Sequence, residues 1–238
     1  MTWDWSVVTA NAHALLLGLW LTLVFTVISS ALGLVWGTVL AIGRLSARRW
    51  IAWPATALLE VVRGVPLLVL LIWFYFAFPI LTGVGMSAPL AAAIALSLYA
   101  SSYYGEIVRG GILSVPAGQT DAALSLGMTY NERMRRVVLP QAFRLMAPPF
   151  VNQTIINLKN TSLASVVTVG ELTYQAQAIS ASTYRPMEVY TAAALLYLVL
   201  VLPTSFFARR LEVQNVRYGA RRRRKVLQAE GHEEGAVA

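Results

Sequence analysis

The chain has 238 residues, of which 57% are hydrophobic and only 13% are charged. Soluble domains carry roughly a quarter charged residues, so this composition excludes an ordinary soluble domain and indicates a protein that lies in lipid. Cysteine is absent, which excludes disulfide bonds and thiolate chemistry. The net charge of +8 raises the question of nucleic-acid binding, which the positions of the basic residues argue against.

The first twelve residues contain Asp4 and neither Lys nor Arg. A secretory signal begins with a basic region, so we expect no cleaved signal here and a first apolar stretch that persists as a helix. Residues 14–42 contain no charged side chain, well above the roughly 20 apolar residues that a spanning helix needs.

Hydropathy along the chain predicts an all-α membrane protein with about five transmembrane helices, without an internal repeat or a soluble domain. The predicted spans are residues 14–43, 55–80, 89–113, 145–169 and 188–208. Residues 1–210 therefore form one transmembrane domain, and we expect the basic tail, residues 211–238, to be partly disordered.

Basic residues concentrate in alternate gaps between these spans, at 44–49, 133–144 and 209–225, whereas the opposite gaps contain Arg185 alone. This asymmetry follows the positive-inside rule and predicts an outer N-terminus and a cytoplasmic C-terminus. The run Arg221–Lys225 would suit nucleic acid in a soluble protein, but beside a membrane it meets anionic lipid or reinforces the topology.

Two acid–base pairs lie within the second and third spans, Glu60 with Arg63 and Glu106 with Arg109. Residues three apart share a helix face, so each pair can form an ion pair. A charge at this depth costs about 2.5–3.5 kcal/mol on insertion scales, and pairing reduces that cost. We expect structural ion pairs that lock these spans to the following cytoplasmic loop.

Gly64 and Pro66 follow Arg63 directly and predict a break in the second helix. Broken helices are tolerated at membrane depth where they line a cavity, and their exposed backbone groups often hold substrate. Arg63, Gly64 and Pro66 are therefore candidates for substrate binding.

A polar loop at about 115–144 separates the third and fourth spans. The segment from Asp121 to Leu126 predicts a short helix with a carboxylate near its start, which favours the helix dipole. Ala122 and Ala123 leave a flat face that another protein can approach, and Gly127 permits a sharp turn. The alternative is an ordinary solvated loop with basic residues at the membrane rim.

Prolines and a glycine punctuate the flanks of this short helix. Pro116 and Gly118 are expected to break the chain before it, and Pro140 to end or kink the basic helix after it.

The fourth span contains four polar residues near its middle, Lys159, Asn160, Thr161 and Ser162. A zwitterionic amino acid needs acceptors for its ammonium group and donors for its carboxylate, and the last three residues offer both. Lys159 either attracts a carboxylate or pairs with a neighbouring acid. The alternative is that Thr161 and Ser162 bond to their own backbone or join helices.

The outer loop at about 170–187 contains Glu171, Gln175 and Gln177, which either shape an entrance or docking surface or belong to a plain solvated loop. His13 and His232 have no partnering pattern, so we expect no metal site. No phosphate-binding Gly-Lys-Ser/Thr loop occurs, so we expect that this chain neither holds a cofactor nor hydrolyses ATP itself.

The polar loop between the third and fourth spans resembles the EAA loop of ABC importer permeases in both residue type and spacing. The matching residues are Asp121, Ala122, Ala123, Gly127 and the segment 137–140. That motif reads E-A-A-x3-G-x9-I-x-L-P, and here Asp replaces Glu and Val replaces Ile. Four further segments resemble the polar amino acid permease branch, at 62–68, 104–111, 139–144 and 160–163. The resemblance extends over roughly residues 14–208.

The resemblance implies a type I ABC importer permease subunit of the bacterial inner membrane, without catalytic residues, that works as a homo- or heterodimer. Asp121, Ala122, Ala123, Leu126 and Gly127 would couple it to two cytoplasmic ATPase subunits, which carry ATP and Mg. An extracytoplasmic binding protein would deliver a polar amino acid.

Two segments, 35–38 and 62–75, look more like glutamate/aspartate permeases. Some family members have Asp where this chain has Asn160, and this departure disfavours a cationic substrate.

Two other classes of protein remain as alternatives. A secondary transporter driven by an ion gradient usually contains inverted repeats, which this sequence lacks. A non-transporting membrane scaffold would need no polar groups that converge in mid-membrane.

Overall fold

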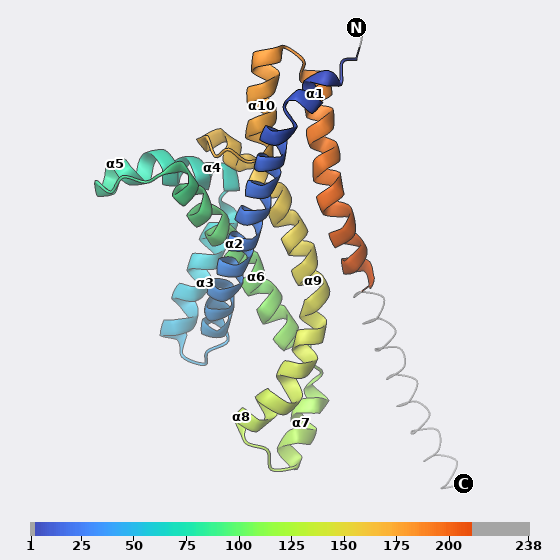
Figure 1. Ribbon diagram of the computed structural model, residues 1–238. Helices are drawn as coiled ribbons and strands as arrows, with labels where there is room; N and C mark the ends of the chain where they lie inside the picture. The colour runs from blue at the N-terminus through green and yellow to red at the C-terminus, as the bar shows by residue number, and fades with distance from the viewer. Residues whose placement is uncertain (1–2, 211–238) are drawn as a thin grey trace.

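The computed structural model describes residues 3–210, and in this part of the chain the protein is helical without strands (Figure 1). The predicted all-α class is thus confirmed, while the basic tail and its run Arg221–Lys225 lie outside the described residues. The helices are α1 (Ser6–Ala10), α2 (Ala12–Arg44), α3 (Arg49–Gly64), α4 (Leu67–Ile72), α5 (Phe78–Thr82), α6 (Ala88–Leu113), α7 (Ala117–Ser125), α8 (Tyr130–Arg133), α9 (Leu139–Asn160), α10 (Leu172–Thr183) and a last helix, Pro186–Arg210.

Each predicted span falls on helical structure. Helix α2 and the last helix are long and apolar enough to cross a membrane, and α3 with the segment Leu67–Thr82 makes a third candidate if a bend of 100° is counted within one span. The stretches 89–113 and 145–169 fall on α6 and on α9, which ends in a 3₁₀ segment, Thr161–Val167. Helix α6 packs against both α2 and α9 and forms the centre of the bundle.

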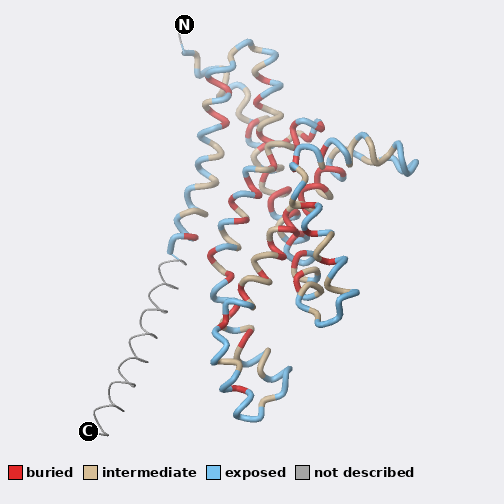
Figure 2. The backbone as a smooth tube through the Cα atoms, turned by 180° about the vertical axis from the view of Figure 1, so that it is seen from behind, coloured by how far each residue is buried: buried red, intermediate tan, exposed pale blue. Residues whose placement is uncertain are grey.

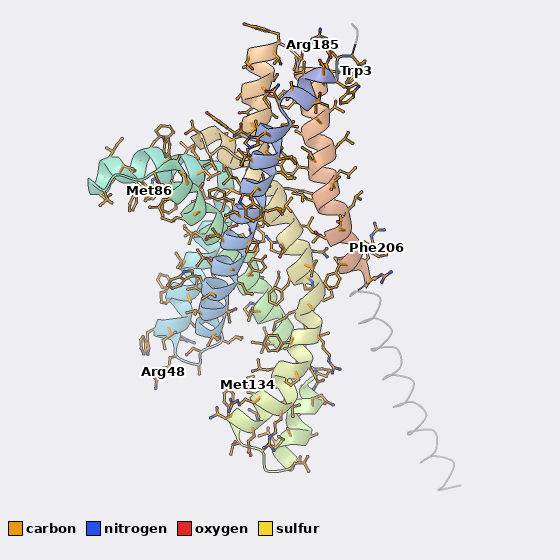
Figure 3. All side chains as sticks on the ribbon, in the orientation of Figure 1. Trp3, Arg48, Met86, Met134, Arg185 and Phe206 are labelled. Atoms are coloured by element: carbon orange, nitrogen blue, oxygen red, sulfur yellow. The ribbon has the colours of Figure 1, made fainter. Side chains whose placement is uncertain are left out.

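The predicted break in the second span lies between α3 and α4. Val65 and Pro66 are extended there, because a residue before proline is driven out of the helical region. As a result, the chain from Leu67 to Thr82 leaves the bundle as a side arm that ends at α5 (Figure 1). Met86, in the predicted outer loop, lies on this arm and not at the end that bears Trp3 (Figure 3).

Two π-helical segments each end two residues before a proline. Trp73–Ala77 precedes Pro79, and Met134–Val138 precedes Pro140. Proline has no N–H to donate and its ring clashes with the carbonyl four residues earlier, so a wider turn accommodates it. Pro140 therefore does not end the helix, which continues without interruption from Tyr130 to Asn160.

Small residues allow α2 and α6 to approach closely. A Cβ atom added at Gly37 would lie 2.6 Å from the carbonyl oxygen of Ser101 and 2.7 Å from the nitrogen of Gly105, and one at Gly33 would lie 2.7 Å from the Ala100 Cβ. Without a hydrophobic driving force between helices in lipid, such small-residue contacts supply the packing.

Gly37→Ala should destabilise the folded protein by about 1–3 kcal/mol, because its methyl group would overlap backbone atoms of α6. Gly110→Ala is the matched control: nothing lies within 4 Å of an added Cβ there, and the better helix propensity should stabilise the protein by up to about 1 kcal/mol. Thermal denaturation in detergent measures both. Equal melting temperatures for the two variants would contradict this packing.

The two ends of the molecule differ in charge. Trp3 and Arg185 lie at one end, next to α10, and Arg48 and Met134 lie toward the other, where α7 and α8 project (Figures 1 and 3). Figure 2 shows buried residues concentrated where the central helices meet, with the side arm and the last helix largely exposed. The basic gaps 44–49 and 133–144 therefore lie toward the same end of the bundle.

Candidate coupling helix and substrate site

Helix α7 includes the segment that was predicted to form a short helix, but it begins earlier, at Ala117. Pro116 is its N-cap and Gly118 lies within it, so the expectation that Gly118 breaks the chain is wrong. Asp121 is the fifth residue of the helix and no acidic residue lies in the first turn. The predicted interaction of Asp121 with the helix dipole is therefore also wrong, because that effect is confined to the first turn.

The alanine pair does not form one open face. Ala123 is buried against the neighbouring helices, whereas Ala122 and Asp121 are exposed. Leu124 and Leu126 are 53% and 81% exposed, so the free surface of α7 is more apolar than the two alanines predict. The sequence reasoning missed Leu124, although an apolar residue in a helix outside the predicted spans was itself a signal.

Gly127 makes the predicted sharp turn. Its φ is +73°, a left-handed conformation that glycine adopts without strain. The Gly127 N–H donates to the Leu124 carbonyl at 2.9 Å and the Met128 N–H donates to the Ala123 carbonyl at 3.1 Å. These two bonds form a Schellman motif, which ends α7 and satisfies its last carbonyl groups.

A capping box starts the next helix. The Glu132 N–H donates to the Thr129 hydroxyl, and the Glu132 carboxylate accepts from the Thr129 N–H at 3.0 Å and from its hydroxyl at 2.8 Å. These bonds hold the pKa of the Glu132 carboxyl below its usual range. The T-x-x-E spacing in the sequence would have revealed this motif. The link from α7 to α8 thus has defined geometry on both sides of Gly127.

Both predicted i,i+3 ion pairs form, and they join into one network. Glu60 pairs with Arg63 and Glu106 with Arg109, and Arg44 from α2 links the pairs. The guanidinium of Arg44 lies 2.8 Å from the Glu106 carboxylate and 3.5 Å from that of Glu60.

This network joins α2, α3 and α6 to one another. The expectation that it locks the spans to the cytoplasmic loop is wrong, because none of the ion pairs between described residues reaches α7. Arg44 was noted only for topology, since its partner Glu106 lies 62 positions away in the sequence.

The four polar residues of the fourth span separate into two groups. Thr161 is fully buried and its hydroxyl donates to the Leu158 carbonyl, and the Ser162 hydroxyl donates to the Lys159 carbonyl. Both hydroxyls therefore bond to the backbone of their own helix, which is the alternative to substrate binding that the sequence analysis left open. Within the described part of the chain, the side chains of Lys159 and Asn160 have no hydrogen-bond partner, and Lys159 is exposed.

The break in the second span and the break in the fourth lie against each other. Leu67 and Leu71 at the start of the side arm pack in one apolar cluster with Ala164 and Val167 of the 3₁₀ segment. Gly64 and Pro66 are exposed just before this contact. The structure therefore brings Gly64 and Pro66 toward the fourth-span candidates but turns the Arg63 side chain into the ion-pair network.

Two buried amides on α9 escaped the sequence reasoning. Asn157 donates to the hydroxyls of Ser29 and Ser30 at 2.8 and 2.9 Å, and its side-chain oxygen is buried without a partner among the described residues. Gln153, one turn earlier, is 6% exposed. Their i,i+4 spacing places them on one helix face, which was the signal available in the sequence.

Glu171 does not belong to an exposed loop. It is fully buried, caps α10 by accepting from the N–H groups of Thr173 and Tyr174, and accepts from the Tyr197 hydroxyl at 2.8 Å. Burial raises the pKa of the Glu171 carboxyl. A docking role for Glu171 is therefore wrong.

The two glutamines of α10 differ from Glu171 in their exposure. Gln175 donates to the Gly170 carbonyl at 3.2 Å and is half-buried, and Gln177 is exposed. Only Gln177 retains the free surface that a docking role needs.

A comparison with protein-family models matches residues 30–214 to the family described as "Binding-protein-dependent transport system inner membrane component". The match covers more than three quarters of the chain and includes α7, the ion-pair network and the fourth span. The chain belongs to this family.

Two curated relatives of this permease have similar length and clear identity. The Glutamate/aspartate import permease protein GltK of Escherichia coli O6:H1 is 37% identical over 216 residues, covering 88% of this chain and 96% of the relative. The Glutamine transport system permease protein GlnP of Escherichia coli K12 is 39% identical over 214 residues, covering 89% and 97%.

A solved structure has the same fold as the permease. The structure described as an amino acid ABC transporter with histidines superposes with a TM-score of 0.85 at 35% identity, covering 90% of this chain and 100% of that one. The fold is that of a type I ABC importer permease, as the EAA-like loop of this chain implied.

Proposed function

We propose that this permease is the membrane subunit of an ATP-driven importer of polar amino acids in the bacterial inner membrane. The observation that carries the proposal is α7, a short helix that projects from one end of the bundle and exposes Leu124 and Leu126 (Figure 1). Leu124 near the end of α7 and Leu126 just after it form an exposed apolar surface beyond the spans, of the kind that a protein partner covers. We assign that role to the ATPase subunits, two per transporter.

The connections of α7 make it suited to transmit force. It follows α6 directly and leads through α8 into α9, so a displacement of α7 acts on the two helices at the centre of the bundle. The Schellman motif and the capping box fix the turn between α7 and α8. Coupling between the ATPase and the substrate site requires a rigid element whose position depends on both. The segment from α7 to α8 meets this requirement, because it is connected to α6 on one side and to α9 on the other.

The substrate site in this proposal lies where the two broken spans meet. The N-terminal end of the helical segment Leu67–Thr82 has free N–H groups that favour a carboxylate. The unpartnered amide of Asn160 can accept from the substrate ammonium group, and Lys159 can attract a second carboxylate. Thr161 and Ser162 shape the 3₁₀ segment by their backbone bonds and contact substrate less directly.

In the resulting cycle, the permease alternates between an outward-open and an inward-open state. ATP binding closes the partner ATPases and displaces α7, and α9 carries the motion to the substrate site. Helix α9 has 22 residues and therefore spans about 33 Å between its two ends. An extracytoplasmic binding protein delivers the amino acid at the end formed by α10.

In this proposal the substrate is a neutral or acidic amino acid, and glutamate or aspartate is the favoured candidate. The support for this assignment is Asn160, which replaces the acidic side chain that a cationic substrate would favour. The relatives include glutamate/aspartate, glutamine and arginine permeases and therefore do not distinguish these substrates. Transport by the reconstituted complex against a panel of acidic, amide and basic amino acids tests this. Preference for a basic amino acid would overturn the assignment.

Co-purification separates the importer from the two alternatives of the sequence analysis. A secondary transporter or a scaffold would elute without an ATPase, whereas the importer should retain two ATPase subunits per permease dimer. The mass of that complex also distinguishes a homodimer from a heterodimer.

The proposed orientation makes a separate prediction about accessibility. A cysteine at Met187, beside Arg185 at the end that bears Trp3, should react with an impermeant thiol reagent added outside, and a cysteine at Asn131 should react only after the membrane is opened. Both positions are exposed, so burial does not confuse the result. Because the chain has no native cysteine, labelling in intact cells reports these sites alone. Labelling of Asn131→Cys from outside would invert the topology.

A further inference from the structure

An apolar cavity of about 620 Å³ lies at the α7 end of the bundle, and we call it the slot. Its walls come from α2, α6 and α9, and it includes Thr38, Ile42, Ile112, Met134, Phe143 and Met146. Of the described side chains that line it, only Thr38, Ser46 and Tyr130 carry a polar group. A polar amino acid would find few hydrogen-bond partners here, so the slot is distinct from the proposed substrate site.

The dimensions of the slot suit an alkyl chain better than a helix. Its lining residues extend from Leu34 to Ile42 on α2 and from Tyr130 to Phe150 on the continuous helix that includes α9. At 1.5 Å per residue these lengths are about 12 and 30 Å, parallel to the helices. The volume then corresponds to a mean cross-section of about 20–50 Å², against about 80 Å² or more for a helix with its side chains. The slot is therefore narrower than a helix.

Two arginines lie next to residues that line the mouth of the slot. The Arg133 guanidinium lies over the ring of Tyr130, 5.6 Å from its centroid. Arg48 follows the lining residue Ser46 by two positions, and its backbone N–H donates to the Ser46 hydroxyl at 3.2 Å. Neither arginine belongs to an ion pair among the described residues. The nearest acid along the chain, Glu132, already accepts both bonds from Thr129. The rim is therefore positive.

We propose that the slot holds an acyl chain of an anionic phospholipid whose phosphate lies against Arg48 and Arg133. The apolar walls favour the chain, and the rim favours the negative headgroup over a zwitterionic one. The inference rests on the proposed orientation, in which this end faces the cytoplasmic leaflet. A lipid here would contact α2, α6 and α9 together, next to the segment that leads from α7.

Quenching of tryptophan fluorescence by lipids brominated on the acyl chain tests the proposal in the full-length permease. The reporter is Phe143→Trp, and its quenching is the fluorescence change of this variant minus that of the wild-type protein. The matched control is Leu198→Trp, on the exposed side of the last helix. Brominated phosphatidylglycerol should quench Phe143→Trp at a severalfold lower mole fraction than brominated phosphatidylcholine. The two lipids should quench Leu198→Trp equally.

Removing the rim charges should abolish the preference. Arg48→Gln and Arg133→Gln should each weaken phosphatidylglycerol binding roughly fivefold, whereas Arg209→Gln with Arg210→Gln should leave it unchanged. Equal quenching by both lipids at Phe143→Trp would overturn the proposal. Loss of quenching on addition of the ATPase or of a second permease copy would overturn it in favour of a protein interface. Transport assays report on the proposed function independently of these outcomes.

Discussion

Gly127→Val should reduce both ATPase association and amino acid transport by roughly 5- to 30-fold while membrane insertion stays normal. Gly127 has a φ of +73°, and a left-handed conformation costs a residue with a Cβ about 1–2 kcal/mol. That cost lowers the fraction of molecules in which α7 is presented correctly, and the apparent affinity falls with that fraction. Co-elution with the ATPase and transport in proteoliposomes measure the two effects.

A second glycine provides the control for this prediction. Gly83 has a φ of +71° and, like Gly127, no atom within 4 Å of an added Cβ, but it lies at the end of α5 on the side arm. Gly83→Val should therefore strain the backbone equally and leave ATPase association intact. Gly127→Asn should restore most of the function, because asparagine tolerates the left-handed region. Wild-type ATPase binding by Gly127→Val would refute the docking role of α7.

Asn160→Ala should raise the transport KM by roughly 5- to 150-fold. Each lost hydrogen bond in a poorly hydrated site costs about 1–3 kcal/mol, and the Asn160 amide has no hydrogen-bond partner among the described residues, which leaves it available to a substrate. The ATPase should still co-elute and its basal activity should persist, because α7 is unchanged. Transport kinetics in proteoliposomes, with saturating binding protein, give the KM.

Thr161→Val is the matched comparison for Asn160→Ala. The Thr161 hydroxyl is buried and already bonds to the Leu158 carbonyl, so its loss should change KM less than that of Asn160. Lys159→Gln should impair an acidic amino acid more than a neutral one if a side-chain carboxylate binds there. A KM within twofold of wild type for Asn160→Ala would place the site elsewhere.

Local features of this protein were readable from the sequence because they depend on neighbouring residues. The apolar stretches, the break at Gly64 and Pro66, and the left-handed turn at Gly127 each follow from side-chain polarity or backbone sterics within a few positions. The i,i+3 ion pairs belong to the same class, since helix geometry alone brings Glu106 next to Arg109.

Features that depend on burial were decided by the tertiary structure. Glu171 and Ala123 were expected to lie at the surface, yet both are buried. Glu171 bonds to Tyr197 of the last helix, and Ala123 is covered by α8 and the segment Met134–Val138, which fold back against α7. Asn157 carries no special motif, and only the approach of α2 supplies its partners Ser29 and Ser30.

The same holds for Arg44, which completes the ion-pair network across a separation of 62 residues. By itself, the sequence determined which segments are helical and where the chain turns, because these follow from local sterics and polarity. Only the tertiary structure decided which polar groups have partners, because desolvation and hydrogen bonding depend on packing between helices.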